Sequence, residues 1–334
     1  MLKRAGAGVG RDDAHEPAIE KARVLGTVTF GASGRHAGPV GFQVPLDVLD
    51  SAGTWVDVWF GRAAARVTQI GGVNLATDGY LVFGKVEIDE TRTRGPQAAA
   101  REAYTSIFAA LEQAGGANPL RFWNYVPHIN QPLDGLERYR HFNIGRQEAF
   151  LAARRTAFEG APAACAIGTE VPALSVYFVA AGDVPIPIEN PRQVSAYHYP
   201  TEYGPRSPTF SRATLTTGTA PMLFISGTAS VVGHRSMHPG DAVAQTRETF
   251  ANLRTLVDAA NSRLQTLLQA PAFALDRLIY TVYLRHAADV QRIRAQFETE
   301  VGSSSAAACN AVFLRADICR ADLLVEIEAT GTAG

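Results

Sequence analysis

The chain has 334 residues, of which 46% are hydrophobic and 19% charged, a composition typical of a packed globular protein with one large or two ordinary domains. Its formal net charge of −1 leaves no global basic field that would hold nucleic acid or an anionic membrane. No apolar stretch is long enough to span a bilayer, and the N-terminus lacks the apolar run of a secretory signal. The cysteines, Cys165, Cys309 and Cys319, are odd in number and widely spaced, which favours a reducing, cytoplasmic compartment over a disulfide framework.

The first half of the chain predicts a domain over residues 21–180, preceded by a mobile tail over residues 1–20. A helix is expected after Gly95-Pro96, because Ala103, Ile107 and Leu111 recur at helical spacing, and a second over about 136–158. Runs rich in Val, Thr and aromatic residues predict strands at 23–30, 54–60, 64–70, 80–87, 120–126 and 174–179.

The second half predicts a domain over residues 209–334, after an irregular connection at 181–208 that is rich in Pro, Tyr and Gly. Helices are expected from Asp241, a plausible N-cap, and over 287–299. Strands are expected at 210–215, 222–226, 278–284, 311–314 and 323–329. The same order of elements therefore occurs twice, which predicts an α+β fold of two tandem domains of similar topology, each a mixed sheet with helices packed on one face.

Motifs for cofactors are missing from the sequence. The glycines of residues 5–10 have the wrong spacing for dinucleotide binding, and there is no phosphate loop, HExxH or GxSxG. His234 and His238 lie four apart in a loop without a plausible ligand set, so no metal site is predicted. The sequence therefore predicts chemistry that protein acids and bases perform without a cofactor.

The C-terminal half resembles the reactive-intermediate deaminase superfamily, small trimeric α+β proteins with ligand clefts at subunit interfaces. The resemblance rests on PTFSRA (208–213), LFISGTAS (223–230), AQTRETFANL (244–253) and LLVEIEA (323–329). It implies that Glu326, the first Glu of the EIEA motif, is the acid–base group of a cleft. The arginine with which the deaminases hold a carboxylate is absent, since Cys309, Asn310 and Ala311 occupy its place, and this argues against imine hydrolysis.

Over residues 115–330 the chain resembles the chorismatases. The segments that carry this resemblance are RFWNYVPHINQ (121–131), GLERYRHFNIGRQEAF (135–150), SAYHYPTEYGPRSPTFSRA (195–213), SGTASVVGHRSMHPGD (226–241) and DICRADLLVEIEA (317–329). Chorismatases have two deaminase-like domains, in agreement with the doubled order of elements. The resemblance implies a lyase that removes pyruvate from chorismate without a cofactor, as a monomer or a homotrimer.

Chorismate is a dianion whose labile bond is an enolpyruvyl ether, and protonation of the terminal CH₂ group allows pyruvate to leave. A carboxylic acid in a partly apolar cleft keeps its proton near neutral pH, which suits Glu326. Glu328 lies two residues along the same strand and projects to the same face. Two glutamates on a solvated strand face are the alternative interpretation.

Guanidinium groups are expected to hold the two carboxylates of the substrate. Arg146 and Arg206 are the first candidates, followed by Arg212 and Arg285. Neutral hydrogen bonds and ring contacts are expected from Asn124, Tyr125, Asn130, Tyr199 and Tyr203.

Two products follow from the same protonation. Attack by water gives a dihydroxycyclohexadiene carboxylate, whereas displacement by the neighbouring ring hydroxyl leads to 3-hydroxybenzoate, with some 4-hydroxybenzoate as a second product. The family associates the aromatising branch with a Cys seven residues before the Glu, here Cys319, and with a small residue in the SGT-x-S loop, here Ala229 where Gly would be the clearest case. The sequence favours 3-hydroxybenzoate, with the diene diol as the alternative. An imine or enamine deaminase, or a ligand-binding protein without activity, is a further alternative.

Overall fold

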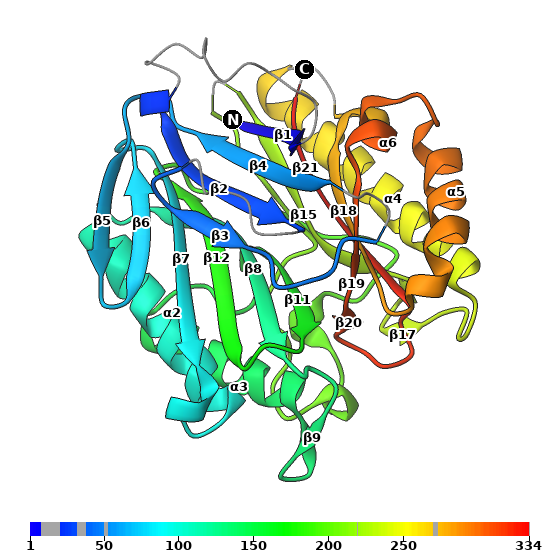
Figure 1. Ribbon diagram of the computed structural model, residues 1–334, viewed down its shortest axis with the longest axis horizontal. Helices are drawn as coiled ribbons and strands as arrows, with labels where there is room; N and C mark the ends of the chain where they lie inside the picture. Colours follow the sequence, from blue (N-terminus) through cyan, green and yellow to red (C-terminus); the bar gives the residue numbers. More distant parts are fainter. Residues whose placement is uncertain (8–20, 32–37, 50–52, 219, 270–272, 334) are drawn as a thin grey trace.

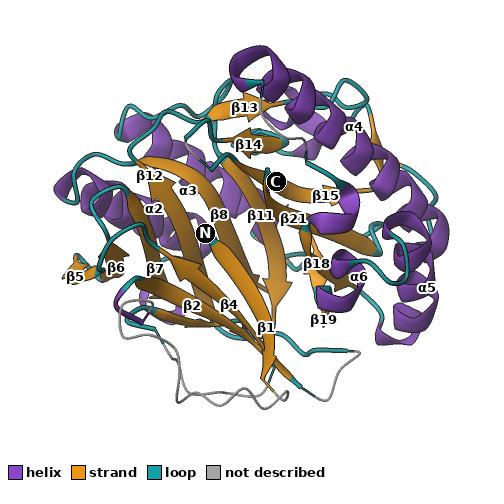
Figure 2. Ribbon diagram, turned by 90° about the horizontal axis from the view of Figure 1, so that it is seen from above, coloured by secondary structure: helices purple, strands orange, loops and turns teal. Residues whose placement is uncertain are grey.

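The computed structural model describes residues 1–7, 21–31, 38–49, 53–218, 220–269 and 273–333. In this part of the chain, three sheets of seven, six and four strands surround a common interior, and the long helices lie on the outside (Figures 1 and 2). None of the described helices is long and apolar enough to cross a membrane.

The N-terminal domain is built on the seven-stranded sheet, in the order β20-β11-β8-β12-β7-β6-β5. Helices α2 (Pro96–Gln113) and α3 (Arg138–Ala152) pack on its outer face, where the apolar stripe of α2 meets the sheet residues. A small hairpin, β9 (Pro132–Leu133) and β10 (Leu136–Glu137), precedes α3. The strands of the sheet are β5 (Arg66–Ile70), β6 (Val73–Thr77), β7 (Leu81–Asp89), β8 (Asn118–Pro127), β11 (Ala163–Thr169), β12 (Ala173–Ala181) and β20 (Asp317–Ile318).

The C-terminal domain is built on the six-stranded sheet, in the order β13-β14-β15-β21-β18-β19. Helix α4 (Ala242–Leu268) begins at Asp241, whose side chain accepts from the backbone N–H groups of Val243 and Ala244, as an N-cap does. Helices α5 (Val290–Val301) and α6 (Ala306–Asn310) complete the outer layer. The strands are β13 (Ile186–Ile188), β14 (Ala213–Leu215), β15 (Met222–Ala229), β18 (Ile279–Leu284), β19 (Val312–Arg315) and β21 (Val325–Thr332), and a hairpin of β16 (Val231–Val232) and β17 (Arg235–Ser236) follows β15.

The two domains share one topology. The order β6-β7-β12-β8-β11 matches β14-β15-β21-β18-β19, with α2 in the place of α4 and α3 in the place of α5. In each domain one pair is parallel, β8 with β11 and β18 with β19, and the other pairs are antiparallel. The predicted fold class, two tandem α+β domains with helices on one face of each sheet, is confirmed.

The structure differs from the prediction at the N-terminus. Leu2–Ala7, expected in a mobile tail, forms strand β1 and pairs with β4 (Thr54–Phe60); residues 8–20 lie outside the described part. The four-stranded sheet β1-β4-β2-β3, with β2 (Val24–Phe30) and β3 (Gly41–Gln43), belongs to neither repeat. Arg4 explains why a polar segment is ordered here, because its guanidinium reaches inward and binds the buried Asp57 at 2.6 Å.

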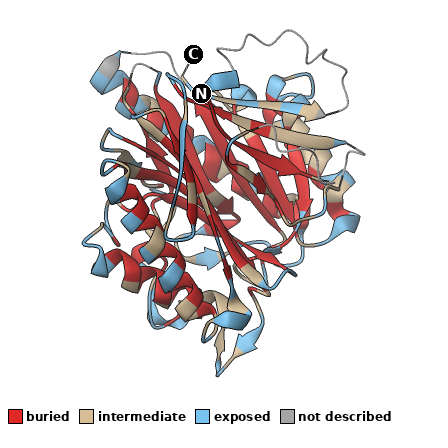
Figure 3. Ribbon diagram, turned by 60° about the vertical axis from the view of Figure 1, so that its left-hand side comes forward, coloured by how far each residue is buried: buried red, intermediate tan, exposed pale blue. Residues whose placement is uncertain are grey.

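The inner faces of the three sheets share one core. Phe42 and Trp59 come from the four-stranded sheet, Trp123 and Tyr177 from the seven-stranded sheet, and Phe224 from the six-stranded sheet. Figure 3 shows that most strands of the two larger sheets are buried along much of their length. We propose that the connection at 181–208 still separates the two domains, although β13 within it pairs with β14 of the C-terminal domain.

Candidate active site

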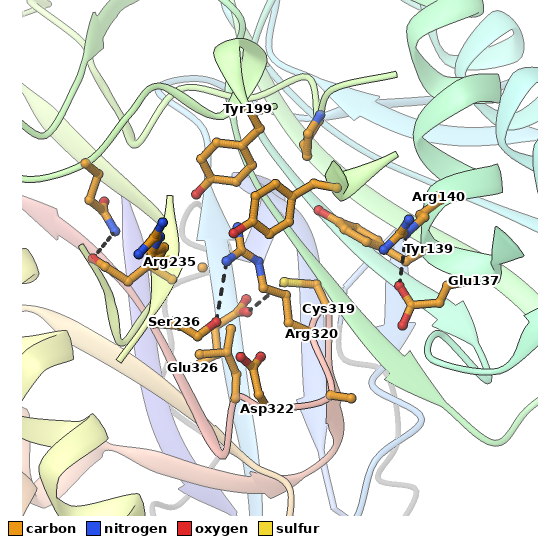
Figure 4. Close-up of a pocket in the computed structure, with 18 of the residues that line it drawn as sticks. Glu137, Tyr139, Arg140, Tyr199, Arg235, Ser236, Cys319, Arg320, Asp322 and Glu326 are labelled. Carbon is orange, nitrogen blue, oxygen red and sulfur yellow. Dashed lines mark hydrogen bonds and ion pairs between the residues drawn. The ribbon is translucent and has the colours of Figure 1, made fainter. Parts of the chain in front are cut away.

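A pocket of about 540 Å³ opens where the two domains meet, a volume within the range of small-molecule sites, roughly 300–1,000 Å³ (Figure 4). The N-terminal domain contributes the start of α3, with Glu137, Tyr139 and Arg140. The C-terminal domain contributes β15, the β16–β17 hairpin, the segment 319–323 and strand β21. One chain therefore builds both walls of this pocket.

Glu326 on β21 lies at the bottom of the pocket and is 3% exposed. The pairing of β15 with β21 shifts register between Ile225 and Thr228, an irregularity that contains Gly227. A Cβ atom on Gly227 would lie 1.9 Å from Oε1 of Glu326. A glycine is therefore required at this position to leave room for the Glu326 carboxyl group.

The electrostatics of Glu326 favour its neutral form. Burial raises the pKa of Glu326 to about 8, the nearby Glu328 carboxylate adds to this increase, and Arg121 opposes it. At neutral pH, Glu326 is therefore protonated in most molecules, as a general acid requires. This protonated carboxyl group lies in the same pocket as Arg212 and Arg320.

Cys319 and Ala229 both lie beside this acid. Sγ of Cys319 is 3.9 Å from Oε2 of Glu326, and Ala229 is the pairing partner of Glu326 across the β15–β21 ladder. Burial, together with the neighbouring Glu326, raises the pKa of Cys319 to about 12, so that its thiol stays protonated. The structure thus brings together the three residues that the sequence proposed as catalytic.

Arg212 and Arg320 line the same pocket next to the predicted Tyr199 and Tyr203. The Arg320 guanidinium stacks on both tyrosine rings, at 5.0 and 4.2 Å from their centroids, and donates to the carbonyl oxygen of His234. Arg212 donates to the hydroxyl oxygen of Tyr199 at 2.8 Å, and its Nε has no acceptor among the described residues. Fixed guanidinium groups with spare donors are suited to an anionic ligand.

Arg146 lies on α3 behind Glu326 and is 2% exposed. It borders a cavity of about 30 Å³, here called the inner annex, which shares Gly227, Cys319 and Glu326 with the main pocket. The guanidinium packs against the ring of Tyr104, yet its Nε and Nη2 find no acceptor within the described part of the chain. A buried cation with free donors therefore points into a space large enough for bound water or a small anionic group.

Arg206 and Arg285, also predicted as carboxylate ligands, do not line this pocket. Arg206 is exposed on the connection between the domains. Arg285 donates to the carbonyl oxygens of Ile318, Arg320 and Leu323, so its donors are used to hold the segment that carries Cys319 and Arg320. Its role in the structure is to fix the wall of the pocket.

The three polar residues predicted from the N-terminal motifs also lie outside the pocket. Asn124 accepts from the Tyr104 hydroxyl and donates to the carbonyl oxygen of Cys165 inside the N-terminal domain. Tyr125 is fully buried in the interior that the three sheets share. Asn130 donates to the carbonyl oxygen of Ile318, beside Arg285. Asn124 and Tyr125 lie on β8, where the alternation of side chains does not show which face of the strand binds a ligand. Asn130 lies in the turn that follows β8.

Several further residues line the pocket that were not predicted from the sequence. Arg320 directly follows Cys319 in the DICRAD segment, and Tyr139 and Arg140 lie in the GLERYRHF segment, so the motifs contained them. The hairpin residue Arg235 likewise lies in the SGTASVVGHRSMHPGD segment. Cys309, at the place where the deaminases carry an arginine, is exposed on α6 and does not line the pocket. Among the described residues, no three His, Cys, Asp or Glu side chains lie close enough together to hold a metal ion.

The fold and the pocket together define a two-domain α+β protein with a neutral carboxylic acid beside several arginines. Comparison with known proteins agrees with this class. A family model described as chorismatase FkbO/Hyg5-like, N-terminal, matches residues 57–180. A 3-hydroxybenzoate synthase from Streptomyces hygroscopicus is 37% identical over 290 residues, which cover 84% of this chain and 82% of that protein. A chorismatase from the same organism is 38% identical over 285 residues, covering 82% and 78% of the two chains.

A solved structure gives the same result. The crystal structure of a chorismatase, 30% identical in sequence, superposes with a TM-score of 0.85 and covers 99% of this chain and 97% of its own. The chain belongs to the chorismatase family.

Proposed function

We propose that this protein removes pyruvate from chorismate, with Glu326 as the general acid. The observation that carries the proposal is the neutral carboxyl group of Glu326, buried at the bottom of a pocket that Arg212 and Arg320 line and that Arg146 borders from behind. The names of the relatives, 3-hydroxybenzoate synthase and chorismatase, support the same reaction.

The arginines bind the two carboxylates of the substrate. One carboxylate takes the free donors of Arg146 from the inner annex, and the other lies against Arg212 and Arg320 in the outer part of the pocket. The tyrosines that stack on Arg320 provide an apolar wall for the ring. We infer that the enolpyruvyl group lies between the two sets of arginines, next to Glu326.

The reaction begins when Glu326 gives its proton to the terminal CH₂ carbon of the enolpyruvyl ether. The product of this step is an oxocarbenium ion, and Glu326 becomes a carboxylate. In the aromatising branch, the neighbouring ring hydroxyl displaces the pyruvyl oxygen, the resulting oxide opens, and loss of a ring proton gives the aromatic product. That proton restores Glu326, so chorismate yields 3-hydroxybenzoate and pyruvate without net consumption of water.

We place this protein in the aromatising branch, with 3-hydroxybenzoate as the main product and some 4-hydroxybenzoate. The Cys319 thiol, which stays protonated, occupies the space next to the carboxyl group where an attacking water would otherwise lie. Ala229 narrows the same wall by one methyl group relative to Gly. In the alternative branch water attacks instead, and the dihydroxycyclohexadiene carboxylate is released with pyruvate.

One experiment tests both the reaction and its branch. The purified protein is incubated with chorismate in ¹⁸O-water, pyruvate is measured with lactate dehydrogenase, and the ring product is identified by mass spectrometry. We expect pyruvate together with hydroxybenzoate that carries no label in its ring hydroxyl. No pyruvate above the spontaneous rate would refute the reaction, and a labelled diene diol as the main product would refute the branch.

The same proposal covers the setting in which the protein works. Both walls of the pocket come from one chain, so a single chain carries a complete site whether the protein is a monomer or a homotrimer. We place it in the cytoplasm, where free thiols such as those of Cys165, Cys309 and Cys319 persist.

A further inference from the structure

Glu328, the second Glu of the EIEA motif, is held by three donors in the shared interior. It is 5% exposed and lies outside the pocket that Glu326 lines. Nη2 of Arg121 donates to its Oε2 at 2.6 Å, and Nε1 of Trp123 and the Tyr283 hydroxyl donate to its Oε1 at 3.0 and 2.9 Å. The Glu328 carboxyl group therefore accepts three hydrogen bonds, one of them from a guanidinium group.

Arg121 is itself fixed between the two domains. It is 1% exposed, starts from β8 of the N-terminal domain, and also donates to the carbonyl oxygen of Ile225 on β15 at 2.8 Å. A buried ion pair of this kind contributes little net stability, because desolvation of two charges offsets their attraction. Its presence beside the active-site strand therefore calls for an explanation other than folding stability.

The geometry relates Glu328 directly to Glu326. The two residues are two positions apart on β21 and project to the same face, so their Cα atoms are about 7 Å apart. Both side chains are shielded from solvent, and charges interact more strongly there than in water. The charge of Glu328 therefore opposes a second negative charge on Glu326.

Other titratable groups also face the two carboxyl groups. Around Glu326, from α3, β11, the segment before β14 and the segment after β20, they include Tyr139, Arg146, Cys165, Arg212, Cys319 and Arg320. The same pocket is also lined by Glu137, Arg140, Tyr199, Glu202, Tyr203, Arg235 and Asp322. Around Glu328, from β1, β4, β8, β12 and β18, they are Arg4, Asp57, Arg121, Tyr125, Tyr177 and Tyr283. Arg4 and Asp57 pair with each other, whereas the charge of Glu328 acts on Glu326 more strongly than that of Arg121.

We propose that Glu328 is a positioning residue, whose carboxylate, bound by Arg121, Trp123 and Tyr283, keeps the proton on Glu326. This inference rests on the proposed function of Glu326. The same charge acts in both halves of the reaction. Before the substrate is protonated, it favours the protonated form of Glu326. Afterwards it makes the Glu326 carboxylate a stronger base, which can take up the ring proton.

The test is a titration of Glu326 in the Glu328→Gln variant, which keeps the shape of the side chain and removes its charge. The carboxyl C=O band is followed by infrared difference spectroscopy against Glu326→Gln, which removes the signal. We expect the midpoint for Glu326 to fall by about one pH unit or more. We also expect the alkaline limb of kcat/KM with chorismate to move down by the same amount.

Two further variants keep the test decisive. Asp57→Asn removes a charge that is equally buried in the same interior, and we expect it to leave the Glu326 midpoint in place. The double variant Arg121→Gln/Glu328→Gln removes both charges of the pair, which protects the fold if the single variant is unstable. Its midpoint is expected below that of the wild type and above that of Glu328→Gln.

The inference is overturned if Glu326 titrates at the same pH in Glu328→Gln as in the wild type. This outcome differs from failure of the proposed function, because the infrared titration needs no substrate. A protein that shows the shift but releases no pyruvate would keep the electrostatic pairing and lose the reaction.

Discussion

The two domains have the same topology, but only one of them carries the acid. In the C-terminal domain the inward-facing positions of β21 include Glu326 and Glu328. In the N-terminal domain β12 takes the place of β21, and its inward-facing positions are Ser175, Tyr177 and Val179.

The surroundings of the two strands explain the difference. The inner face of β12 lies against the four-stranded sheet, where Tyr177 packs on Phe42 at a centroid distance of 4.8 Å and stacks on Trp123. The start of β21 instead meets the pocket, because Gly227 and the register shift in β15 leave space above Glu326. The two strands are equivalent in the repeated fold, but β12 packs in the core whereas β21 carries the active-site acid.

The largest effect is expected from the acid itself. Glu326→Gln keeps the shape of the side chain but has no proton to give, and we expect a loss of roughly 10²–10⁴-fold in kcat with chorismate. Binding should survive, because it depends on the arginines, so the dissociation constant measured by calorimetry should change little. A variant with more than a third of the wild-type rate would show that the acid is another residue.

The space above the acid is tested by Gly227→Ala. The added methyl group would meet Oε1 of Glu326 and displace the carboxyl group, and we expect a loss of about 10²-fold in kcat. Gly53→Ala is the matched control, since a Cβ atom there meets no atom within 4 Å, and its rate should equal that of the wild type. Equal rates for both variants would remove the argument that the register shift makes room for Glu326.

The contribution of the N-terminal domain to binding is tested by Arg146→Ala. Loss of a charge-assisted pair with a substrate carboxylate is expected to weaken binding by about 1.5–3 kcal/mol, measured by titration calorimetry with chorismate in the Glu326→Gln background. The exposed Arg206 gives the control, because Arg206→Ala should bind as the parent does. Weaker binding in Arg206→Ala than in Arg146→Ala would return Arg206 to the site and contradict this arrangement.

The smallest effect concerns stability. The raised pKa of Glu326 means that the folded protein binds more protons than the unfolded chain between the ordinary pKa of Glu and about 8, so this group destabilises the folded protein as the pH rises through that window. Glu326→Gln should therefore melt about a few degrees higher than the wild type above pH 8 and equally at acidic pH. Differential scanning calorimetry at both ends of the window measures this, and a variant that melts lower at alkaline pH would argue for an ionised Glu326.

The sequence predicted the repeated order of elements where a strand or helix has a clear apolar pattern, but it did not predict β6 or the almost uniformly buried β11. Helix α2, with Ala103, Ile107 and Leu111 all buried against the sheet, is an example of a clear pattern. The sequence also did not predict β1, since the polar segment around Arg4 acquires its order from Asp57, which lies far along the chain.

The site was predicted in part for a similar reason. Glu326, Cys319 and Ala229 lie in continuous motifs, whereas the partners of an arginine are set by tertiary contacts. Arg206 lies in a motif segment, as Arg146 does, yet it is exposed, and Arg285 is bound by backbone carbonyl groups. Nothing in the local sequence distinguishes Arg206 from Arg146.

The pH dependence of kcat/KM for chorismate tests the central claim most directly, because it asks whether Glu326 works with its proton on. Initial rates of pyruvate release are measured for the wild type across about pH 5–10, with Glu326→Gln as the comparison. We predict a plateau at lower pH and a fall above about pH 8, with no such limb in the residual rate of the variant. A wild-type rate that rises through pH 8 would mean that the carboxylate is the active form, and would contradict the account.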